Sequence, residues 1–346
     1  MKTSIPAMMT RIFALMAACS TLALTTASAQ SPAEWLAARV AEATGTRGSV
    51  VAGHEGWLFF TPELRHLIAA SGPFWGDAAE TVSRVRREDA KDPLPPILAF
   101  HQALQVEGVR LIMVPVPAKA TIYPEALSPR LRPSPRTDAG HLEFFDLLRA
   151  EGIEVLDLTE RFLEGRDDAM GPLYCRQDSH WSGIACVIAA NEIASLLGLE
   201  PIEASGMTST WNTLEIRGDL WRMIEDNPPE PESLPLRFIT RNGAPVEPDP
   251  ESPILLLGDS HNLVFHAGDD MHARGAGLAD QLAYRLGRPL EVIAVRGSGA
   301  TPARINLFRR AQRDPDYWSG KQAVIWVFSV REFTESNGWR EVPIQL

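Results

Sequence analysis

Short apolar runs alternate along the chain with longer segments in which apolar residues recur every three or four positions. The short runs are typical of buried strands, and the longer periodic segments are typical of helices. The pattern predicts strands at residues 109–115, 153–158, 254–257, 290–295 and 323–328, and helices at 31–42, 94–107, 142–149, 182–197, 275–286 and 301–312. Apolar strands that alternate with helices indicate an α/β fold, in which a mostly parallel sheet is covered by helices on both faces.

The alternation is interrupted between about residues 199 and 252. Prolines crowd this region, at positions 228, 229, 231, 235, 245, 248, 250 and 253. Because proline lacks the backbone N–H that regular elements use, the region is predicted to leave the core. It is either a lid or rim over a functional site or a surface loop without a role. We expect residues 30–346 to form one domain that contains this Pro-rich excursion.

The first 29 residues differ from the rest of the chain. Lys2 and Arg11 supply positive charge, residues 12–24 are almost entirely apolar, and Ala27-Ser28-Ala29 has the small residues of a cleavage site. This pattern predicts a cleaved secretory signal peptide. The apolar run is shorter than the roughly 20 residues that span a membrane. An uncleaved inner-membrane anchor is the alternative interpretation.

The chain is acidic, and cleavage would make it more so. Its formal charge is −11, and the loss of Lys2 and Arg11 would lower it by two to −13. Nucleic acids bind to basic surfaces, so a nucleic-acid partner is not expected. An anionic polymer would need a local basic groove.

Two cysteines, Cys175 and Cys186, would remain after cleavage. In an oxidising compartment, a lone pair within one short stretch suggests a disulfide. Such a bridge would hold the residues between them in a closed loop, or it would be structural only. A thiol nucleophile is the other interpretation.

The predicted strand at 254–257 ends in Gly258-Asp259-Ser260. A serine in this position lies at the carboxyl edge of the sheet, where ligands bind in open α/β folds. Its own N–H can face a developing oxyanion. Ser260 is therefore a candidate nucleophile, although Asp and Ser are also frequent helix caps.

A serine hydroxyl needs a base, and Asp178-Ser179-His180-Trp181 offers one. Asp178 and His180 can face the same side of an extended segment, so the carboxylate can orient the imidazole as in a catalytic triad. Trp181 could shield this pair or form a platform for a sugar. In the alternative interpretation Asp178 caps the helix predicted near residue 182 and His180 is a loop residue.

Three further histidines, His261, His266 and His272, raise the question of a metal site. Their spacing matches no compact ligand pattern, so we predict neither a metal nor a cofactor.

Several short motifs occur in an order that is specific when they are taken together. They are Gly53-His54-Glu55-Gly56-Trp57-Leu58-Phe59 within a predicted loop, Pro115-Val116-Pro117-Ala118-Lys119, Ile122-Tyr123-Pro124-Glu125, Asp178-Ser179-His180-Trp181, Gly258-Asp259-Ser260 and Val327-Phe328-Ser329-Val330-Arg331-Glu332-Phe333. On these motifs the chain resembles the AlgJ/AlgX-type alginate (polysaccharide) O-acetyltransferases, a branch of the SGNH hydrolase-like proteins. As in that family, the Asp-x-His-Trp motif precedes the serine, an order permuted relative to ordinary SGNH esterases.

The resemblance implies a three-layer α/β/α sandwich, a periplasmic location and acetyl transfer onto an exported polysaccharide. It assigns Ser260 as nucleophile, His180 as base and Asp178 as the residue that orients the base. Contacts to the oxyanion or substrate are assigned to Arg296 and Gly297, in the turn Arg296-Gly297-Ser298-Gly299, and to Trp181, Lys119 and Tyr123. The expected partners are the polysaccharide acceptor, a membrane-bound O-acyltransferase that passes on the acetyl group, and proteins of an export complex.

Two departures from the family pattern stand out: His261 follows the serine where an aromatic residue is more frequent, and no carbohydrate-binding module follows Arg331. The triad alone does not separate a transferase from a carbohydrate acetyl esterase, because the acceptor decides between them. A non-catalytic polysaccharide-binding component of an export complex is the third interpretation.

Overall fold

The computed structural model describes residues 32–45, 49–132, 136, 138–199 and 206–345. Pro32–Leu346 form one compact unit. The predicted signal peptide over residues 1–29 lies outside the described residues. Within the described ranges, no helix has the length and apolar character needed to cross a membrane.

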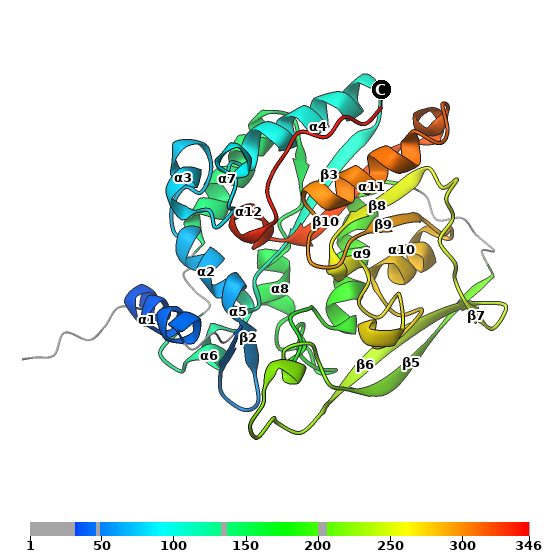
Figure 1. The fold of residues 1–346 in the computed structure, drawn as a ribbon. Coiled ribbons are helices and arrows are strands. Elements are labelled where there is room, and N and C mark those ends of the chain that lie inside the picture. Colours follow the sequence, from blue (N-terminus) through cyan, green and yellow to red (C-terminus); the bar gives the residue numbers. More distant parts are fainter. Residues whose placement is uncertain (1–31, 46–48, 133–135, 137, 200–205, 346) are drawn as a thin grey trace, which may run out of the picture. The chain divides into compact units, whose positions relative to one another are not determined.

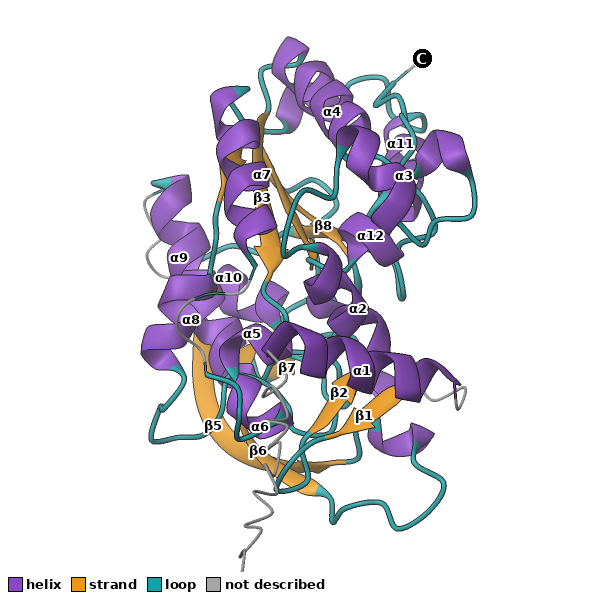
Figure 2. Ribbon diagram, turned by 90° about the vertical axis from the view of Figure 1, so that its left-hand side faces the viewer, coloured by secondary structure: helices purple, strands orange, loops and turns teal. Residues whose placement is uncertain are grey.

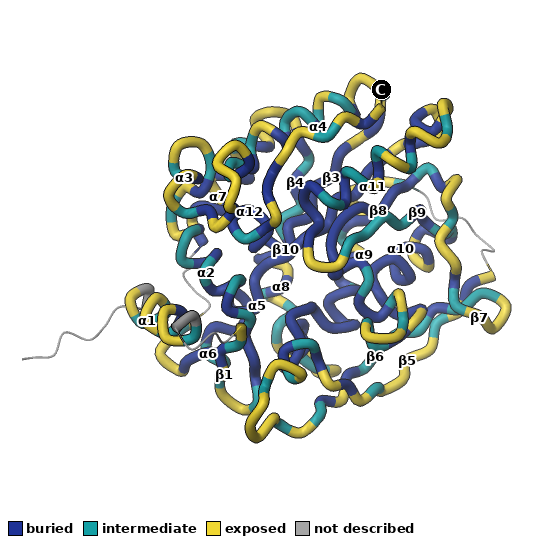
Figure 3. The backbone as a smooth tube through the Cα atoms, viewed as in Figure 1, coloured by how far each residue is buried: buried dark blue, intermediate teal, exposed yellow. Residues whose placement is uncertain are grey.

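The five predicted apolar strands pair into one parallel sheet (Figure 1). Its order is β4-β3-β10-β8-β9, and each neighbouring pair is parallel. The strands are β3 (Arg110–Val116), β4 (Glu154–Val155), β8 (Ile254–Gly258), β9 (Glu291–Ala294) and β10 (Ala323–Ser329). Every residue of β8 and β10 is buried, which agrees with their unbroken apolar sequences. In the tube of Figure 3 these strands form the buried centre of the described chain.

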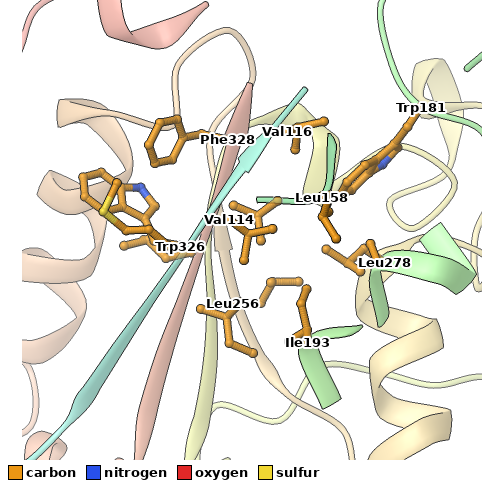
Figure 4. Packing of buried hydrophobic residues seen from close by; sticks show 14 of the residues in the cluster. Val114, Val116, Leu158, Trp181, Ile193, Leu256, Leu278, Trp326 and Phe328 are labelled. Carbon is orange, nitrogen blue, oxygen red and sulfur yellow. The ribbon is translucent and has the colours of Figure 1, made fainter. Parts of the chain in front are cut away.

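Helices cover both faces of this sheet, as the α/β/α prediction requires (Figure 2). Figure 4 shows Trp326 and Phe328 on one side, and Ile193 of α9 and Leu278 of α10 on the other. On the side of Trp326 and Phe328, the Trp326 ring packs edge-on against the Phe100 ring of α4, with 5.3 Å between the ring centroids. The described helices are α1 (Pro32–Gly45), α2 (Thr61–Ala69), α3 (Ala79–Val82), α4 (Leu94–Val106), α5 (Lys119–Ile122), α6 (Pro124–Leu127), α7 (Ala139–Ala150), α8 (Thr159–Gly165), α9 (Gly183–Leu197), α10 (Leu278–Leu286), α11 (Thr301–Ala311) and α12 (Glu332–Glu335).

The Pro-rich excursion is not a loop in its described part. It forms a second, antiparallel sheet of β5 (Met207–Ile216), β6 (Glu232–Arg241) and β7 (Ala244–Pro245). Most of its prolines lie between or beyond these strands, and Pro235 stands within β6. Leu234, Leu236 and Ile239 of β6 are buried, so the sheet adds to the core.

The predicted loop at Gly53–Phe60 is the connection and second strand of a small hairpin. β1 (Val50–Ala52) pairs antiparallel with β2 (Leu58–Phe60). Glu55 and Gly56 form its turn with φ of +52° and +78°. Each strand has only three residues, too few for the alternation of polar and apolar positions to show.

Candidate active site

Ser260 lies at the carboxyl end of β8, in a single 3₁₀ turn that spans Ser260–Asn262. Gly258 permits this turn, because its φ is +152° and a Cβ there would lie 1.7 Å from Val327 O of β10. Only glycine fits such a close approach between two strands. The close contact between β8 and β10 therefore fixes where the serine leaves the sheet.

Asp259 holds this turn in place. Its carboxylate accepts hydrogen bonds from the backbone N–H groups of His261 at 2.9 Å and Ser329 at 2.8 Å, and from the His261 ring at 3.1 Å. Burial alone would raise the pKa of Asp259, but His261 and these hydrogen bonds hold it well below its usual range. Asp259 thus ties the serine turn to the end of β10 as an anion.

His180 reaches Ser260 from the segment between α8 and α9. An antiparallel bridge joins Tyr174 to Trp181, and Cys175 N–H donates to His180 O at 3.2 Å, so the segment closes on itself. Ser182 caps α9 through a hydrogen bond from Ala185 N–H, a role that the alternative interpretation gave to Asp178.

The structure brings the three predicted triad residues together. His180 Nε2 lies 2.7 Å from Ser260 Oγ, and His180 Nδ1 lies 2.5 Å from Asp178 Oδ1. All three residues are at most 5% exposed. Both distances are in hydrogen-bond range, and the order serine, imidazole, carboxylate is that of a nucleophile, a base and its orienting acid.

Asp178 accepts four hydrogen bonds. Oδ1 accepts from the ring and, at 3.1 Å, from the backbone N–H of His180. Oδ2 accepts from the backbone N–H of Asp219 and from Nε2 of His272, both at 2.8 Å. A carboxylate with this many donors is strongly favoured over the protonated acid.

The pKa shifts of the pair follow from this geometry. Burial alone would raise the pKa of Asp178, but His180 and His272 hold it well below its usual range. Burial alone would lower the pKa of His180, but the charge and hydrogen bond of Asp178 raise it above its ordinary value. The imidazole is therefore a stronger base than a free histidine, and its orienting acid stays ionised.

Lys119 contacts the backbone next to the triad and none of the triad side chains. Its buried Nζ donates to Asp178 O at 2.6 Å, Leu58 O at 2.8 Å and Arg176 O at 3.5 Å. Its backbone N–H donates to Glu63 at 3.2 Å. The side chain is 1% exposed, so the predicted contact with substrate or oxyanion is wrong and its role is to hold the backbone at Asp178.

Trp181 is fully buried, which contradicts a direct contact with a sugar, and the Tyr123 hydroxyl is engaged by backbone groups. Trp181 is fully buried and donates from Nε1 to His261 O at 3.1 Å, so it joins the base segment to the serine turn. The Tyr123 hydroxyl donates to Arg166 O at 2.7 Å and accepts from Leu173 N–H at 2.9 Å. Both side chains are part of the packing that supports the site.

Arg296 and Gly297 are not joined to the triad by any hydrogen bond in the described ranges. The Arg296 side chain is about half exposed and pairs with Asp270 at 2.5 Å. Nothing lies within 4 Å of where a Cβ on Gly297 would be. The turn approaches the serine segment at Gly299 instead, where a Cβ would lie 2.7 Å from Asp259 N.

The N–H of Ser260 has no acceptor among the described residues. It belongs to the first residue of the 3₁₀ turn, where no earlier carbonyl is placed to accept from it. It is thus the donor available to an oxyanion that forms on an acyl group bound to Ser260 Oγ.

Cys175 and Cys186 do not form the disulfide that their spacing suggested. Both thiols are free and buried, and Cys175 Sγ contacts Trp181 O at 3.4 Å. Burial raises the pKa of both thiols, which makes them poor nucleophiles. The loop that a disulfide would have closed is closed by backbone hydrogen bonds.

The three further histidines each pair with a different aspartate. His261 bonds Asp259, His266 bonds Asp280 and His272 bonds Asp178. They therefore do not form one ligand set.

Asp178, His180 and Asp219 do offer ligand atoms within 4.8 Å of one another, a grouping that could hold a metal ion. However, both ring nitrogens of His180 are already hydrogen-bonded within the triad. The Asp219 carboxylate accepts from the Ser179 N–H at 2.7 Å and the Ser179 hydroxyl at 2.5 Å. The triad arrangement thus accounts for these groups without a metal.

The sequence did not predict the contacts of Asp219 and His272 with Asp178. Asp219 lies in the Pro-rich excursion, where Gly218 lets the chain pack against Gln177 and Asp178; a Cβ at Gly218 would lie 2.1 Å from Gln177 O. His272 follows the 3₁₀ turn Asp269–Met271. They are 41 and 94 residues from Asp178 along the chain, so no local spacing points to them.

Curated relatives of the chain include proteins named "Probable alginate O-acetylase AlgJ". The one from Pseudomonas aeruginosa is 30% identical over 216 residues, which are 58% of this chain and 49% of that protein. The one from Pseudomonas putida is 26% identical over 239 residues, 64% of this chain and 56% of that protein. The chain thus spans about half the length of these relatives.

Two solved structures share the fold. The O-acetyltransferase domain of Pseudomonas putida AlgJ superposes with a TM-score of 0.59 at 22% identity, over 84% of this chain and 93% of that one. Pseudomonas aeruginosa AlgX superposes with a TM-score of 0.58 at 17% identity, over 86% of this chain and 65% of that one. At these identities the likeness concerns the fold, and it confirms the predicted α/β architecture.

The match to a protein family is more extensive. Residues 50–330 match the family described as "SGNH hydrolase-like domain, acetyltransferase AlgX". This range contains both sheets and all three triad residues, and the predicted resemblance is confirmed. The chain belongs to the SGNH hydrolase-like AlgX acetyltransferase family.

Proposed function

We propose that this protein is a periplasmic O-acetyltransferase, which moves an acetyl group through an acyl-serine intermediate onto a hydroxyl of an exported polysaccharide. The observation that carries the proposal is the pair of hydrogen bonds from Ser260 Oγ to His180 Nε2 and from His180 Nδ1 to Asp178. Membership of the AlgX family supports acetyl as the transferred group.

In the first half-reaction, His180 Nε2 takes the proton of the Ser260 hydroxyl as Oγ attacks the acetyl carbonyl carbon. The resulting oxyanion lies near the free N–H of Ser260. When this intermediate collapses, the bond between the acetyl carbon and the donor oxygen breaks. His180 then returns its proton to that oxygen, and the acetyl group remains as an ester on Ser260.

In the second half-reaction, a sugar hydroxyl takes the place of the donor. His180 removes the proton of this hydroxyl, the sugar oxygen attacks the acyl-serine carbonyl, and Ser260 leaves with the proton from His180. Asp178 remains ionised throughout and stabilises the imidazolium that forms twice in each cycle.

The acceptor is an alginate-like or other exopolysaccharide in this proposal. The relatives named as alginate O-acetylases support a polymer of this kind. The acetyl group would be passed on by a membrane-bound O-acyltransferase, and proteins of an export complex would bring the polymer. The signal-peptide pattern of residues 1–29 supports the periplasm as the location.

The test is to incubate the purified protein with a chromogenic acetyl ester, with and without an oligosaccharide acceptor. We expect a mass gain of one acetyl group on the oligosaccharide and loss of this activity in Ser260→Ala. Ser329→Ala is the matched control, because Ser329 is buried at the neighbouring strand end. That control should retain activity.

Other outcomes would identify the competing functions. Release of acetate with no acetyl on any oligosaccharide indicates a carbohydrate acetyl esterase with the same triad. Binding of the oligosaccharide without turnover of any ester indicates a non-catalytic component of an export complex. Full activity in Ser260→Ala would contradict the mechanism itself.

The pH profile gives a second check. Since the pKa of His180 is raised, the base becomes protonated at a higher pH than a free histidine would. We expect kcat/KM to fall on acidification with an apparent pKa above 6.5, the ordinary histidine value.

A further inference from the structure

The geometry points to His272 as a positioning residue for the triad. We propose that its Nε2–H, on the Asp178 oxygen opposite His180, takes up part of the negative charge of that carboxylate and holds its direction toward His180. This inference rests on the proposed function, because it assigns a role within the same site.

The contact itself is direct. His272 Nε2 lies 2.8 Å from Asp178 Oδ2, and the His272 side chain is 7% exposed. A carboxylate only accepts hydrogen bonds, so the nitrogen that faces it carries a proton. Asp178 therefore lies between two imidazoles, with His180 on Oδ1 and His272 on Oδ2.

The backbone that delivers His272 is strained. His272 has φ of +71° and ψ of −47°, outside the regions that non-glycine residues ordinarily occupy. Phe265 and Asp269 of the same loop also have positive φ, so the loop holds three of the six such non-glycine residues in the described chain. Strain of this kind persists where surrounding contacts enforce it, and it concentrates at functional sites.

Contacts on both sides of His272 enforce this conformation. Ala267 and Arg274 form an antiparallel bridge, and Phe265 N–H donates to Met271 O at 2.8 Å. Arg296 pairs with Asp270, two residues before His272. Arg296 thus contacts the loop that carries His272, whereas the sequence predicted a contact with the oxyanion.

The same loop contains a matched control. His266 bonds Asp280 at 3.0 Å and its side chain is 11% exposed, so it is also a partly buried histidine on a buried aspartate. Its partner lies in α10, outside the triad. Loss of a histidine–aspartate pair as such would affect both sites alike, whereas loss of a positioning role would affect only His272.

Several titratable or charged groups face Asp178 and enter any pH measurement. They are His180, His272, Asp219, Lys119 of α5, Glu232 of β6 and Cys175, and the groups that act on His180 itself further include Asp259, His261 and Glu63. With His272 replaced by phenylalanine, Oδ2 keeps only the Asp219 N–H. More of the negative charge of the carboxylate then acts on His180, so the pKa of His180 rises.

The experiment compares His272→Phe, His272→Gln, His266→Phe and the unchanged protein. For His272→Phe we expect kcat to fall about tenfold or more with KM little changed, and the acidic limb of kcat to move to higher pH. His272→Gln retains an N–H donor and should recover most of kcat. His266→Phe should leave kcat and the acidic limb unchanged.

A second readout does not depend on turnover. The pKa of the His180 ring, followed by NMR of histidine-labelled protein, should rise in His272→Phe and stay constant in His266→Phe. If no ester is turned over by the unchanged protein, the proposed function fails while this titration still tests His272. A His180 pKa unchanged in a folded His272→Phe protein would overturn the inference, as would equal effects of the two phenylalanine variants.

Discussion

Lys119 acts on the triad through backbone atoms alone. Its ammonium group is buried among the carbonyl oxygens of Leu58, Arg176 and Asp178, from three segments that meet beneath the site. Burial lowers the pKa of Lys119, and Glu63 and other nearby acids partly offset this. A buried ammonium on carbonyl oxygens fixes the backbone at Asp178, and with it the direction of the carboxylate.

We expect Lys119→Met to lose both stability and activity. The substitution leaves buried carbonyl oxygens without a donor, which costs about 1–3 kcal/mol in the free energy of unfolding. It also frees the Asp178 backbone, so kcat should fall. Denaturant unfolding and ester turnover measure the two effects.

Lys321→Met is the matched control for this prediction. Lys321 donates to Pro250 O at 3.1 Å and Ser252 O at 2.7 Å, which precede β8, whereas Ser260 follows the other end of that strand. Its loss should lower stability while kcat of the folded protein is retained. A normal kcat in Lys119→Met would show that the ammonium has no positioning role.

At the scale of elements, the second sheet is a working part of the site. Its strand β6 begins with Glu232, whose carboxylate accepts the N–H groups of Arg176 at 2.8 Å and Gln177 at 2.9 Å. The connection between β5 and β6 supplies the N–H of Asp219 to Asp178. The Pro-rich excursion thus fixes the backbone of Arg176 and Gln177 and the carboxylate of Asp178 by hydrogen bonds. We call this set of contacts the clamp.

Glu232→Gln tests this clamp. The amide has only one oxygen to accept with, and its NH₂ group would face a backbone donor, so we expect the melting temperature and kcat to fall together. Glu215→Gln is the control, because Glu215 lies on the partner strand of the same hairpin and is exposed. Equal behaviour of the two variants in both measurements would contradict the clamp.

Much of this architecture could be predicted from the sequence because its signals are local. The strand at 254–257 and the helix at 182–197 have unbroken apolar or periodic patterns, and they appear as β8 and α9. The second sheet was missed because Thr, Ser, Asn, Arg and Pro interrupt the apolar residues of its strands. Its position depends on packing against α9 and α10, which local patterns do not encode.

The candidate site divides in the same way. Ser260, His180 and Asp178 could be predicted because each stands in a short motif next to a strand or helix end. Asp219 and His272 could not, because their roles follow from tertiary contacts alone. Trp181 was predicted to contact the substrate or shield the pair, and its full burial contradicts the contact with substrate.

At the scale of the whole molecule, two buried carboxyl groups make stability depend on pH. Burial raises the pKa of both Glu63 and Glu332 to about 7, although nearby Arg331 opposes this shift. Their ordinary value is 4.5. The folded protein therefore binds protons more tightly than the unfolded chain, so the stability they contribute is full below pH 4.5 and is lost as pH rises through about 7.

The double variant Glu63→Gln, Glu332→Gln removes this dependence. We expect the melting temperature of the variant to rise relative to that of the unchanged protein as the pH increases from 5 to 8. The reason is that the variant no longer forms two buried anions. Each pKa unit corresponds to about 1.4 kcal/mol. Burial lowers the pKa of His66 well below its usual range, so His66 destabilises both proteins alike in acid. The difference in melting temperature between the two proteins therefore reports on the two carboxyl groups.

The control for the double variant replaces two exposed glutamates by glutamine: Glu143, which lies in α7, and Glu151, which follows its last residue. Its melting temperature should follow that of the unchanged protein at every pH. A difference between the double variant and the unchanged protein that stays constant across the range would contradict the assignment.

The proposed mechanism requires a covalent acetyl group on Ser260, and mass spectrometry of the rapidly quenched protein tests this most directly. The protein would be mixed with an activated acetyl ester, stopped in acid within its first turnovers and digested for peptide mapping. We expect one added acetyl group on the peptide that contains Ser260, and none there in His180→Ala or Ser260→Ala. Turnover of the ester with acetyl on another residue, or undiminished turnover in Ser260→Ala, would contradict the proposed mechanism.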